Sequence, residues 1–262
     1  ILMFYAANMV GALVSLIHPL SAEKEIQNYV NGSGATFLLS LDLVYDKVHN
    51  IVDNTCIKKI VIASAGDSLK TIKKFLYKFK NRGTVPKIEL TDDIMTWNEF
   101  INYGYDYQGE IACLKGANDP AVILYSGGTS GDPKGILLTN MNFNALALSC
   151  HKMIEQSGEG ESILAILPIF HGFGLGVCIH TTLGCGMRVV LVPNFNPKDF
   201  GNTVKGAIKY QEMLEQRAFL IAKGYIPIQR YKDYKENVLS TEFGNVKPKF
   251  KGGYVFANLN EI

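Results

Sequence analysis

The chain has 262 residues, of which 47% are hydrophobic and 19% are charged, and its formal net charge is +2. This composition excludes a disordered polypeptide and indicates a globular protein that buries a sizeable core. The small net charge gives no indication of nucleic-acid binding. The five cysteines include no C-x-x-C pair, which argues against a disulfide framework or a zinc site, so we expect a protein of the reducing cytoplasm.

The first seventeen residues form an apolar run, ILMFYAANMVGALVSLI. A membrane-spanning helix needs about 20 apolar residues, and this run is shorter and lacks both a basic flank and a cleavage site. We therefore expect a buried helix and no integral membrane segment, with a membrane span as the less favoured alternative. Because the chain opens with Ile1 rather than methionine, we also expect its start to be missing.

A second helix is predicted to begin near Ser21, whose hydroxyl can accept a hydrogen bond from a free backbone N–H at the helix start. Asn31-Gly32 is expected to end this helix. Two apolar runs follow, at Ala35 to Leu41 and at Ile60 to Ala63, and both have the length of a buried strand.

The stretch from Ser68 to Lys80 has apolar residues at helical spacing, with lysines between them. A basic amphipathic helix can bind a membrane surface. More often such a pattern belongs to a surface helix with one solvated face, and we favour that interpretation. The apolar positions are Ile72, Phe75, Leu76 and Phe79.

The later part of the chain alternates predicted strands with predicted helices. The pattern is weak between Pro86 and Pro120, but the run Ala121 to Tyr125 predicts a strand that leads directly into a glycine-rich loop. Such alternation is typical of an α/β fold with largely parallel sheets flanked by helices. The further elements expected are a helix from Thr139 or Asn140 to about Ile154, a strand at 163–167, a helix after Gly172, a strand at 187–192 and a helix at 204–223.

The glycine-rich loop has the sequence YSGGTSGDPKG. Glycines leave backbone N–H groups free to point together at an anion. Ser126, Thr129 and Ser130 add hydroxyl donors, and Lys134 adds a positive charge, a combination that an ordinary turn does not need. A Walker P-loop is excluded because two residues separate Gly131 from the lysine. The loop therefore predicts phosphate binding.

The segment YSGGTSGDPKG, followed by ILLTNMN, resembles the phosphate-binding signature of adenylate-forming enzymes. These include acyl-CoA synthetases, luciferases and nonribosomal-peptide adenylation domains, and such a match is highly specific. The resemblance implies that Thr129, Ser130 and Gly131 wrap the β- and γ-phosphates of ATP. It also implies that Lys134 neutralises the departing pyrophosphate.

Two positions depart from the pattern of the family. Gly127 stands where the family usually has serine, which removes one hydroxyl donor, and Asn140 stands where it often has histidine. The catalytic candidates that the resemblance implies are Lys134 and Thr129. The nucleotide-binding candidates are Ser126, Gly127, Gly128, Thr129, Ser130, Gly131 and Lys134.

The segment ILPIFHGFGLG is similar to a second family segment, which lines the pocket for the carboxylate substrate. The resemblance places His171 near the substrate carboxylate, and Phe173 and Gly174 along the acyl or aryl channel. A lone histidine is more often structural, but its place in this segment favours the substrate role. A dinucleotide motif is the weak alternative, because G-x-G-x-x-G would need glycine at Val177.

The function that the resemblance implies is activation of a carboxylic acid by ATP. An acyl-adenylate and pyrophosphate form first, and a thiol such as CoA then takes the acyl group. Mg²⁺ is expected as a cofactor, but its acidic ligand belongs to a Y-G-x-T-E segment that we do not find, and Glu242 in STEFGN is not assigned that role. Apolar residues of the second segment favour a fatty or aromatic acid: Ile169, Phe170, Phe173 and Leu175.

The resemblance runs from Ile1 to about Phe200 and then stops. We expect residues 1–200 to form a partial N-terminal adenylation domain, truncated at both ends, and residues 201–262 to be an unassigned tail from a chimeric join or a frameshift. We expect the chain alone to have little or no turnover. The alternative is a catalytically inactive nucleotide-binding or interaction module on the same half-fold. A third is a structural or nucleic-acid-binding protein carried by the basic, aromatic tail.

Overall fold

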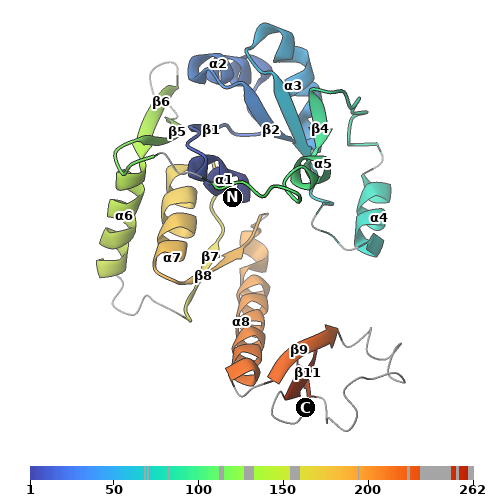
Figure 1. Cartoon of the computed structure of the whole chain (residues 1–262), viewed down its shortest axis with the longest axis vertical. Helices are drawn as coiled ribbons and strands as arrows, with labels where there is room; N and C mark the ends of the chain where they lie inside the picture. Colours follow the sequence, from blue (N-terminus) through green and yellow to red (C-terminus); the bar gives the residue numbers. More distant parts are fainter. Residues whose placement is uncertain are drawn as a thin grey trace. The chain divides into compact units, whose positions relative to one another are not determined.

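A computed structural model of the chain confirms the α/β class and divides the chain into two compact units (Figure 1). Unit 1 comprises Ile1–Ser157 and Leu167–Cys185, and unit 2 comprises Gly158–Ile166 and Gly186–Ile262. The residues that the structure describes are 1–67, 69, 71–81, 83–111, 115–126, 133–153, 160–193, 195–222, 225–230, 249–251 and 254–258.

Unit 1 contains most of the expected strands and helices. Its regular elements, in chain order, are α1 (Leu2–Met9), β1 (Val14–Leu16), α2 (Glu23–Ser33), β2 (Phe37–Leu41), the 3-10 turn η1 (Asp42–Val44), α3 (Tyr45–Ile51), the 3-10 turn η2 (Val52–Asn54), β3 (Lys59–Ala63), α4 (Thr71–Lys80), β4 (Ile94–Thr96), α5 (Trp97–Asn102), β5 (Pro120–Ser126), β6 (Lys134–Thr139), α6 (Asn140–Met153), the π-helix η3 (Phe173–Thr181) and α7 (Thr182–Gly184).

Two sheets organise the described part of unit 1. Strands β2, β3 and β4 pair in parallel, with Leu38 opposite Ile60 and Ile60 opposite Ile94. Helix α3 packs its Tyr45 and Val48 against this sheet. The second sheet has the order β1-β5-β6, in which β1 and β5 are parallel and β6 is antiparallel. The central strand β3 and the strand β5 are mostly buried, which explains their continuous apolar sequences, whereas β2 exposes Phe37, Leu39 and Leu41.

The prediction of one helix across the first seventeen residues was wrong. Helix α1 ends at Met9, and Gly11 adopts φ +83°, a left-handed conformation in which glycine has no steric penalty. That turn releases the chain into β1, whose residues pair with β5. Among the described residues, no helix is both long and apolar enough to cross a membrane.

The boundaries of α2 also differ from the prediction. Ala22 occupies the N-cap position without a side-chain hydrogen bond, so Ser21 is not the cap. Its hydroxyl instead bonds the side chain of Glu25 and, as the leading cause, lowers the pKa of that carboxyl. The helix runs past Asn31-Gly32 to Ser33, because the residue that can turn the chain is Gly34, at φ +65°.

Side-chain caps fix two other helix starts. At α6 the Thr139 hydroxyl accepts a hydrogen bond from the Asn142 N–H at 3.2 Å, while the Asn142 side chain accepts one from the Thr139 N–H at 2.9 Å, which confirms the predicted start. Helix α5 begins with a capping box between Thr96 and Glu99. The sequence carried this signal too, but α5 and β4 were not predicted because the surrounding stretch has no clear period.

Unit 2 contains a parallel strand pair, one long helix and an antiparallel sheet. Strands β7 (Ser162–Ala165) and β8 (Arg188–Leu191) pair in parallel, as expected for this class. After the 3-10 turn η4 (Pro197–Asp199), helix α8 runs from Phe200 to Ala222. Gln211 of α8 hydrogen-bonds the Ser162 hydroxyl and the Gly160 carbonyl. The sheet has the order β10-β11-β9, with β9 (Tyr225–Arg230), β10 (Lys249–Lys251) and β11 (Tyr254–Asn258).

Candidate active site

The β5–β6 hairpin holds both ends of the glycine-rich loop. Ser126 ends β5 and lies opposite Lys134, the first residue of β6. The Ser126 hydroxyl donates a weak hydrogen bond to the Lys134 carbonyl at 3.5 Å. Lys134 is exposed. The other nucleotide-binding candidates lie outside the described residues: Gly127, Gly128, Thr129, Ser130 and Gly131.

The base of this loop is fixed to the rest of unit 1 by aromatic stacking. Tyr125 stacks on Tyr29 of α2, with ring centroids 3.9 Å apart. The Tyr125 hydroxyl donates to the Tyr29 carbonyl at 3.1 Å and lies 2.9 Å from Ser15 Oγ in β1. Burial, followed by a hydrogen bond to Glu25, raises the pKa of Tyr29 to about 12. The strand that delivers the loop is therefore anchored at its last residues.

A surface hollow of 780 Å³ lies beside the anchored stem. Tyr29 and Lys24 of α2 line one side, and Pro133 and Gly135 of the hairpin line the other. A side chain at position 135 would be crowded, because an added Cβ would lie 3.1 Å from Ile123 and 3.3 Å from the Tyr125 ring. The hollow thus brings a second lysine, Lys24, to the same hairpin, which the sequence gave no means of predicting.

The second segment lies against the same strand that delivers the loop. A Cβ added at Gly172 would lie 3.5 Å from the Leu124 side chain of β5. His171 is exposed, and its Nδ1 accepts a hydrogen bond from the Phe173 N–H at 3.3 Å. The neighbouring Phe170 ring lies 4.3 Å from the His18 ring. Strand β5 therefore brings two motifs together that are separated by over thirty residues in the sequence.

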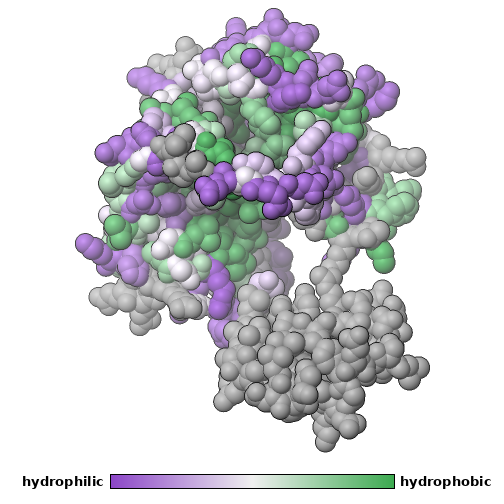
Figure 2. All heavy atoms as spheres, in the orientation of Figure 1, coloured by the Kyte–Doolittle hydropathy of each residue, from purple (hydrophilic) through white to green (hydrophobic). Residues whose placement is uncertain are grey.

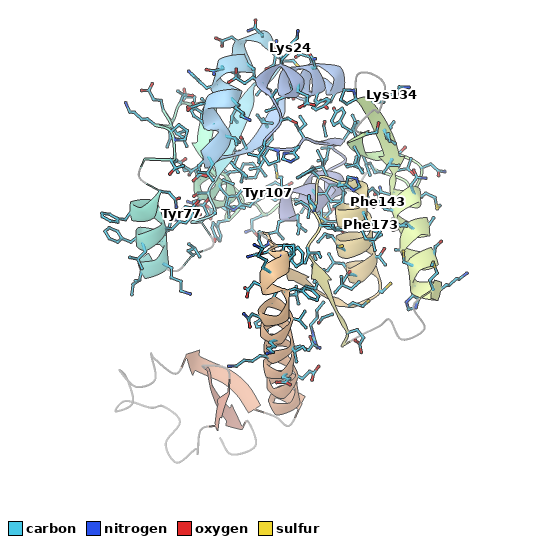
Figure 3. The ribbon with its side chains drawn as sticks, turned by 180° about the vertical axis from the view of Figure 1, so that it is seen from behind. Lys24, Tyr77, Tyr107, Lys134, Phe143 and Phe173 are labelled. Atoms are coloured by element: carbon cyan, nitrogen blue, oxygen red, sulfur yellow. The ribbon has the colours of Figure 1, made fainter. Side chains whose placement is uncertain are left out.

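Gly174 occupies a place that admits no side chain. It is buried, and an added Cβ would overlap the Pro168 carbonyl and lie 2.9 Å from the Leu167 oxygen. Its neighbour Phe173 is exposed. Figure 3 shows Phe173 well apart from Lys134, which stands at the loop end of the hairpin. The described residues therefore do not bring the phosphate lysine and the predicted acid-channel residue into contact.

The helix expected after Gly172 is present, but it begins as a π-helix rather than an α-helix. Two threonine hydroxyls donate hydrogen bonds to backbone carbonyls within this segment. Thr181 donates to the Gly176 carbonyl at 3.0 Å, and Thr182 donates to the Cys178 carbonyl at 2.8 Å. π-helical turns occur frequently at functional sites, so this winding is consistent with a substrate role for the segment.

His180 joins η3 to two other helices of unit 1. Its ring nitrogens lie 3.2 Å from the Tyr5 hydroxyl of α1 and 3.0 Å from the Asn144 side-chain oxygen of α6. Burial lowers the pKa of this histidine below its ordinary value. The interaction is structural and was not predicted, because its partners are far apart in the sequence.

The chemistry of the described donors fits a phosphate group. A hydroxyl at Ser126 and a cation at Lys134 lie at the same end of one hairpin, and both are donor types that bind anions. In the part of the chain that the structure describes, no three His, Cys, Asp or Glu side chains gather where they could hold a metal ion.

Comparison with known proteins identifies the family. The family model described as AMP-binding enzyme matches residues 1–212, which is most of the chain. The chain belongs to the AMP-binding enzyme family. The long-chain-fatty-acid–CoA ligase of Bacillus subtilis is 28% identical over 199 residues, which cover 75% of this chain and 36% of the relative. A probable 4-coumarate–CoA ligase of Dictyostelium discoideum is 27% identical over 210 residues, covering 77% of this chain and 35% of that protein.

Solved structures of the family share the fold of this AMP-binding chain. A long-chain-fatty-acid–CoA ligase from Archaeoglobus fulgidus superposes with a TM-score of 0.59 at 21% identity, covering 78% of this chain and 35% of that one. The chain thus spans about a third of the length of the relatives it matches. A second family model, described as FAD-dependent protein, C-terminal domain-like, matches residues 187–262.

Proposed function

We propose that this AMP-binding chain forms the part of an enzyme that binds the phosphates of ATP, and that this enzyme joins a carboxylic acid to the thiol of CoA. The observation that carries the proposal is the pairing of Ser126 with Lys134 at the end of an anchored hairpin, in a chain whose residues 1–212 match the AMP-binding model. The names of the relatives, which are acid–CoA ligases, support the same reaction.

The reaction has two steps. A carboxylate oxygen attacks the α-phosphorus of ATP, the bond to the bridging oxygen breaks, and pyrophosphate leaves with the electron pair. The sulfur of the CoA thiolate then attacks the acyl carbon and releases AMP. The role of Lys134 is to stabilise the negative charge that grows on the pyrophosphate, assisted by donors from Thr129, Ser130 and Gly131. Mg²⁺ would add further charge neutralisation, through a ligand that we do not assign to this chain.

The acid pocket is proposed to use the segment beside β5. His171 is exposed and its Nδ1 is held by the Phe173 N–H, so its proposed role is to meet the acid carboxylate. Phe173 would face the acyl or aryl group, and Gly174 keeps the backbone close to Pro168 so that the channel can form. These apolar neighbours favour a fatty or aromatic acid.

The boundary between the adenylation part and the tail is a further part of the proposal. The adenylation part is proposed to end near residue 200, with residues 201–262 as a tail of different origin. The start of a second family model at residue 187 supports this boundary. Since the relatives are about three times longer than the matched region, the chain alone is expected to bind ATP with little or no turnover.

The test is a calorimetric titration of ATP into the purified 262-residue chain, into Lys134→Ala and into Lys87→Ala. Lys87 is an exposed lysine of unit 1 whose described partner is Glu89, which makes it a matched control. We expect Lys134→Ala to weaken binding about tenfold or more, as loss of a charge-assisted contact should, and the control to bind like wild type. Absence of ATP binding by wild type would contradict the proposal.

An ATP–pyrophosphate exchange assay on the same chain tests the statement about turnover. Fatty acids of several lengths and 4-coumarate are offered as substrates. We expect exchange at the background rate with every acid. Robust exchange would show that the chain is a complete catalyst and would overturn that part of the proposal, while leaving the role of Lys134 to the titration.

A further inference from the structure

Two described contacts attach helix α4 to unit 1, and both lie on one side of the helix. Tyr77 rests on the backbone of Gly66, where an added Cβ would lie 3.0 Å from its ring. Lys74 forms an ion pair with Asp67, with the charged atoms 3.6 Å apart. At 100° per residue, positions 74 and 77 lie on one side of the helix. This side faces the chain segment that leads into α4.

The opposite side of α4 is apolar and exposed. Successive helical positions are about 100° apart, so residues 72, 75, 76 and 79 form a stripe about 100° wide that lies opposite positions 74 and 77. Their exposed fractions lie between 59% and 71%. Figure 2 shows hydrophobic side chains at the surface where Figure 1 draws α4. The stripe consists of Ile72, Phe75, Leu76 and Phe79.

The charge around this stripe has one sign. Residues 68–88 contain six lysines and one arginine and no aspartate or glutamate. Lys73 is exposed and lies beside the stripe on the helix surface. The nearest acidic groups along the chain are Asp67, which already pairs with Lys74, and Glu89, which pairs with Lys87. The apolar stripe therefore belongs to a segment with a strong excess of positive charge, and Lys73 flanks it.

We propose that α4 docks this chain onto an anionic membrane surface. Four large apolar side chains on one face can enter the boundary between lipid headgroups and acyl chains, while the lysines bind anionic headgroups. With ten residues the helix is too short to span a bilayer, so it lies in the surface. A lipid surface satisfies both features at once, because it offers apolar depth and dense negative charge over the whole length of the stripe.

Vesicle flotation with the full chain, in the absence of ATP, tests the proposal. We expect the chain to float with vesicles containing 30% phosphatidylglycerol in phosphatidylcholine, and to remain unbound with phosphatidylcholine alone. Raising the salt from 50 to 500 mM is expected to reduce the bound fraction severalfold, since the anionic attraction is screened. Absence of binding to the anionic vesicles at low salt would overturn the proposal.

A pair of double variants locates the contact. Phe75→Glu with Phe79→Glu is expected to lower the partition coefficient at least tenfold. Leu20→Glu with Leu148→Glu changes two leucines of unit 1 whose exposed fractions, 71% and 63%, are close to those of the two phenylalanines, and it should bind nearly as wild type does. Equal circular dichroism spectra check that both variants fold. Equal loss in the two double variants would show that α4 is not the docking element.

A fluorescent reporter on α4 gives a second readout that does not depend on loss of binding. The chain has one tryptophan, Trp97. In Trp97→Phe, the further change Phe75→Trp places a single indole on the stripe. We expect its emission to shift to the blue with anionic vesicles and to be quenched by brominated acyl chains. An unchanged spectrum, together with concentration-dependent self-association in sedimentation velocity, would instead assign the stripe to a contact between two copies of the chain.

Discussion

The helices η3 and α4 of unit 1 differ in the burial of their apolar residues. In η3 most residues are buried, Ile179 completely, and small residues let neighbouring backbone approach. In α4 the four large apolar residues are all exposed, including Phe75 at 70%. The sequence of η3 is apolar on all sides, as is typical of a buried helix, whereas α4 has lysines between its apolar residues, as is typical of a surface helix.

The difference between the two helices lies in what surrounds them. Helix η3 contacts α1 and α6 through His180, and its Gly176 lies under Leu146 of α6. Helix α4 is attached at Tyr77 and Lys74, and the four large apolar side chains on its other side are exposed. Burial is therefore a property of packing partners that the linear sequence does not display.

The largest effect is expected from Gly174→Ala in η3. The new Cβ would overlap the Pro168 carbonyl, which belongs to backbone and cannot rotate away. We expect a loss of about 4 kcal/mol or more in the free energy of unfolding. Gly176→Ala is the control, because its Cβ would meet only the flexible end of Leu146 at 2.7 Å, and it should cost about 1 to 2 kcal/mol. Urea unfolding measures both, and equal costs would contradict the account.

The next largest effect is expected from truncating a buried side chain in η3, compared with truncating an exposed side chain in α4. Ile179→Ala removes a side chain with no exposed surface, and we expect a cost of about 3 kcal/mol. Phe75→Ala removes a larger side chain that is mostly exposed, and we expect a change within about 0.5 kcal/mol. Thermal unfolding of the two variants gives the comparison. A large cost at Phe75 would mean that α4 packs against the body of unit 1.

The pH dependence of stability tests how the burial of His180 affects the free energy of unfolding. Burial lowers its pKa below the ordinary value of 6.5, so the folded state binds a proton less readily than the unfolded state. This contribution is fully present above pH 6.5 and is lost as the pH falls toward the folded pKa. We expect His180→Gln to reduce the loss of stability between pH 7 and pH 5.5. An unchanged pH profile would show that His180 does not titrate differently on folding.

The smallest effect concerns thiol reactivity. Cys178 of η3 is buried, and burial raises the pKa of its thiol. Cys56 is exposed. Because the thiolate is the reactive form, we expect a soluble disulfide reagent to modify Cys56 in seconds to minutes and Cys178 only on unfolding. Mass spectrometry of labelled peptides distinguishes the two sites, and rapid labelling of Cys178 would indicate that η3 opens readily.

The sequence predicted the elements whose signals are local. Strand β5 was predicted from an uninterrupted apolar run, and α6 from its Thr139 cap. Strand β1 was missed because Gly11 turns the chain within a run that is apolar throughout. Helix α3 was missed although Tyr45, Val48 and Ile51 repeat every three residues, because the segment between two strands is short.

For the candidate site, the sequence indicated the loop but not its support. The hydroxyls, glycines and Lys134 form a recognisable pattern within eleven residues. The stacking of Tyr125 on Tyr29 joins residues 96 positions apart, and no local pattern encodes such a contact. The same holds for Gly172 beside Leu124, which places the second segment against β5. Those contacts depend on how the strands pair, which only the folded chain displays.

The central claim is that Lys134 binds the phosphates of ATP that leave as pyrophosphate. The most direct test compares the binding of ATP and of AMP to wild type and to Lys134→Ala by calorimetry. We predict that the variant loses about tenfold or more in affinity for ATP and for inorganic pyrophosphate, and little for AMP. Equal losses for ATP and AMP, or no loss for ATP, would contradict the claim.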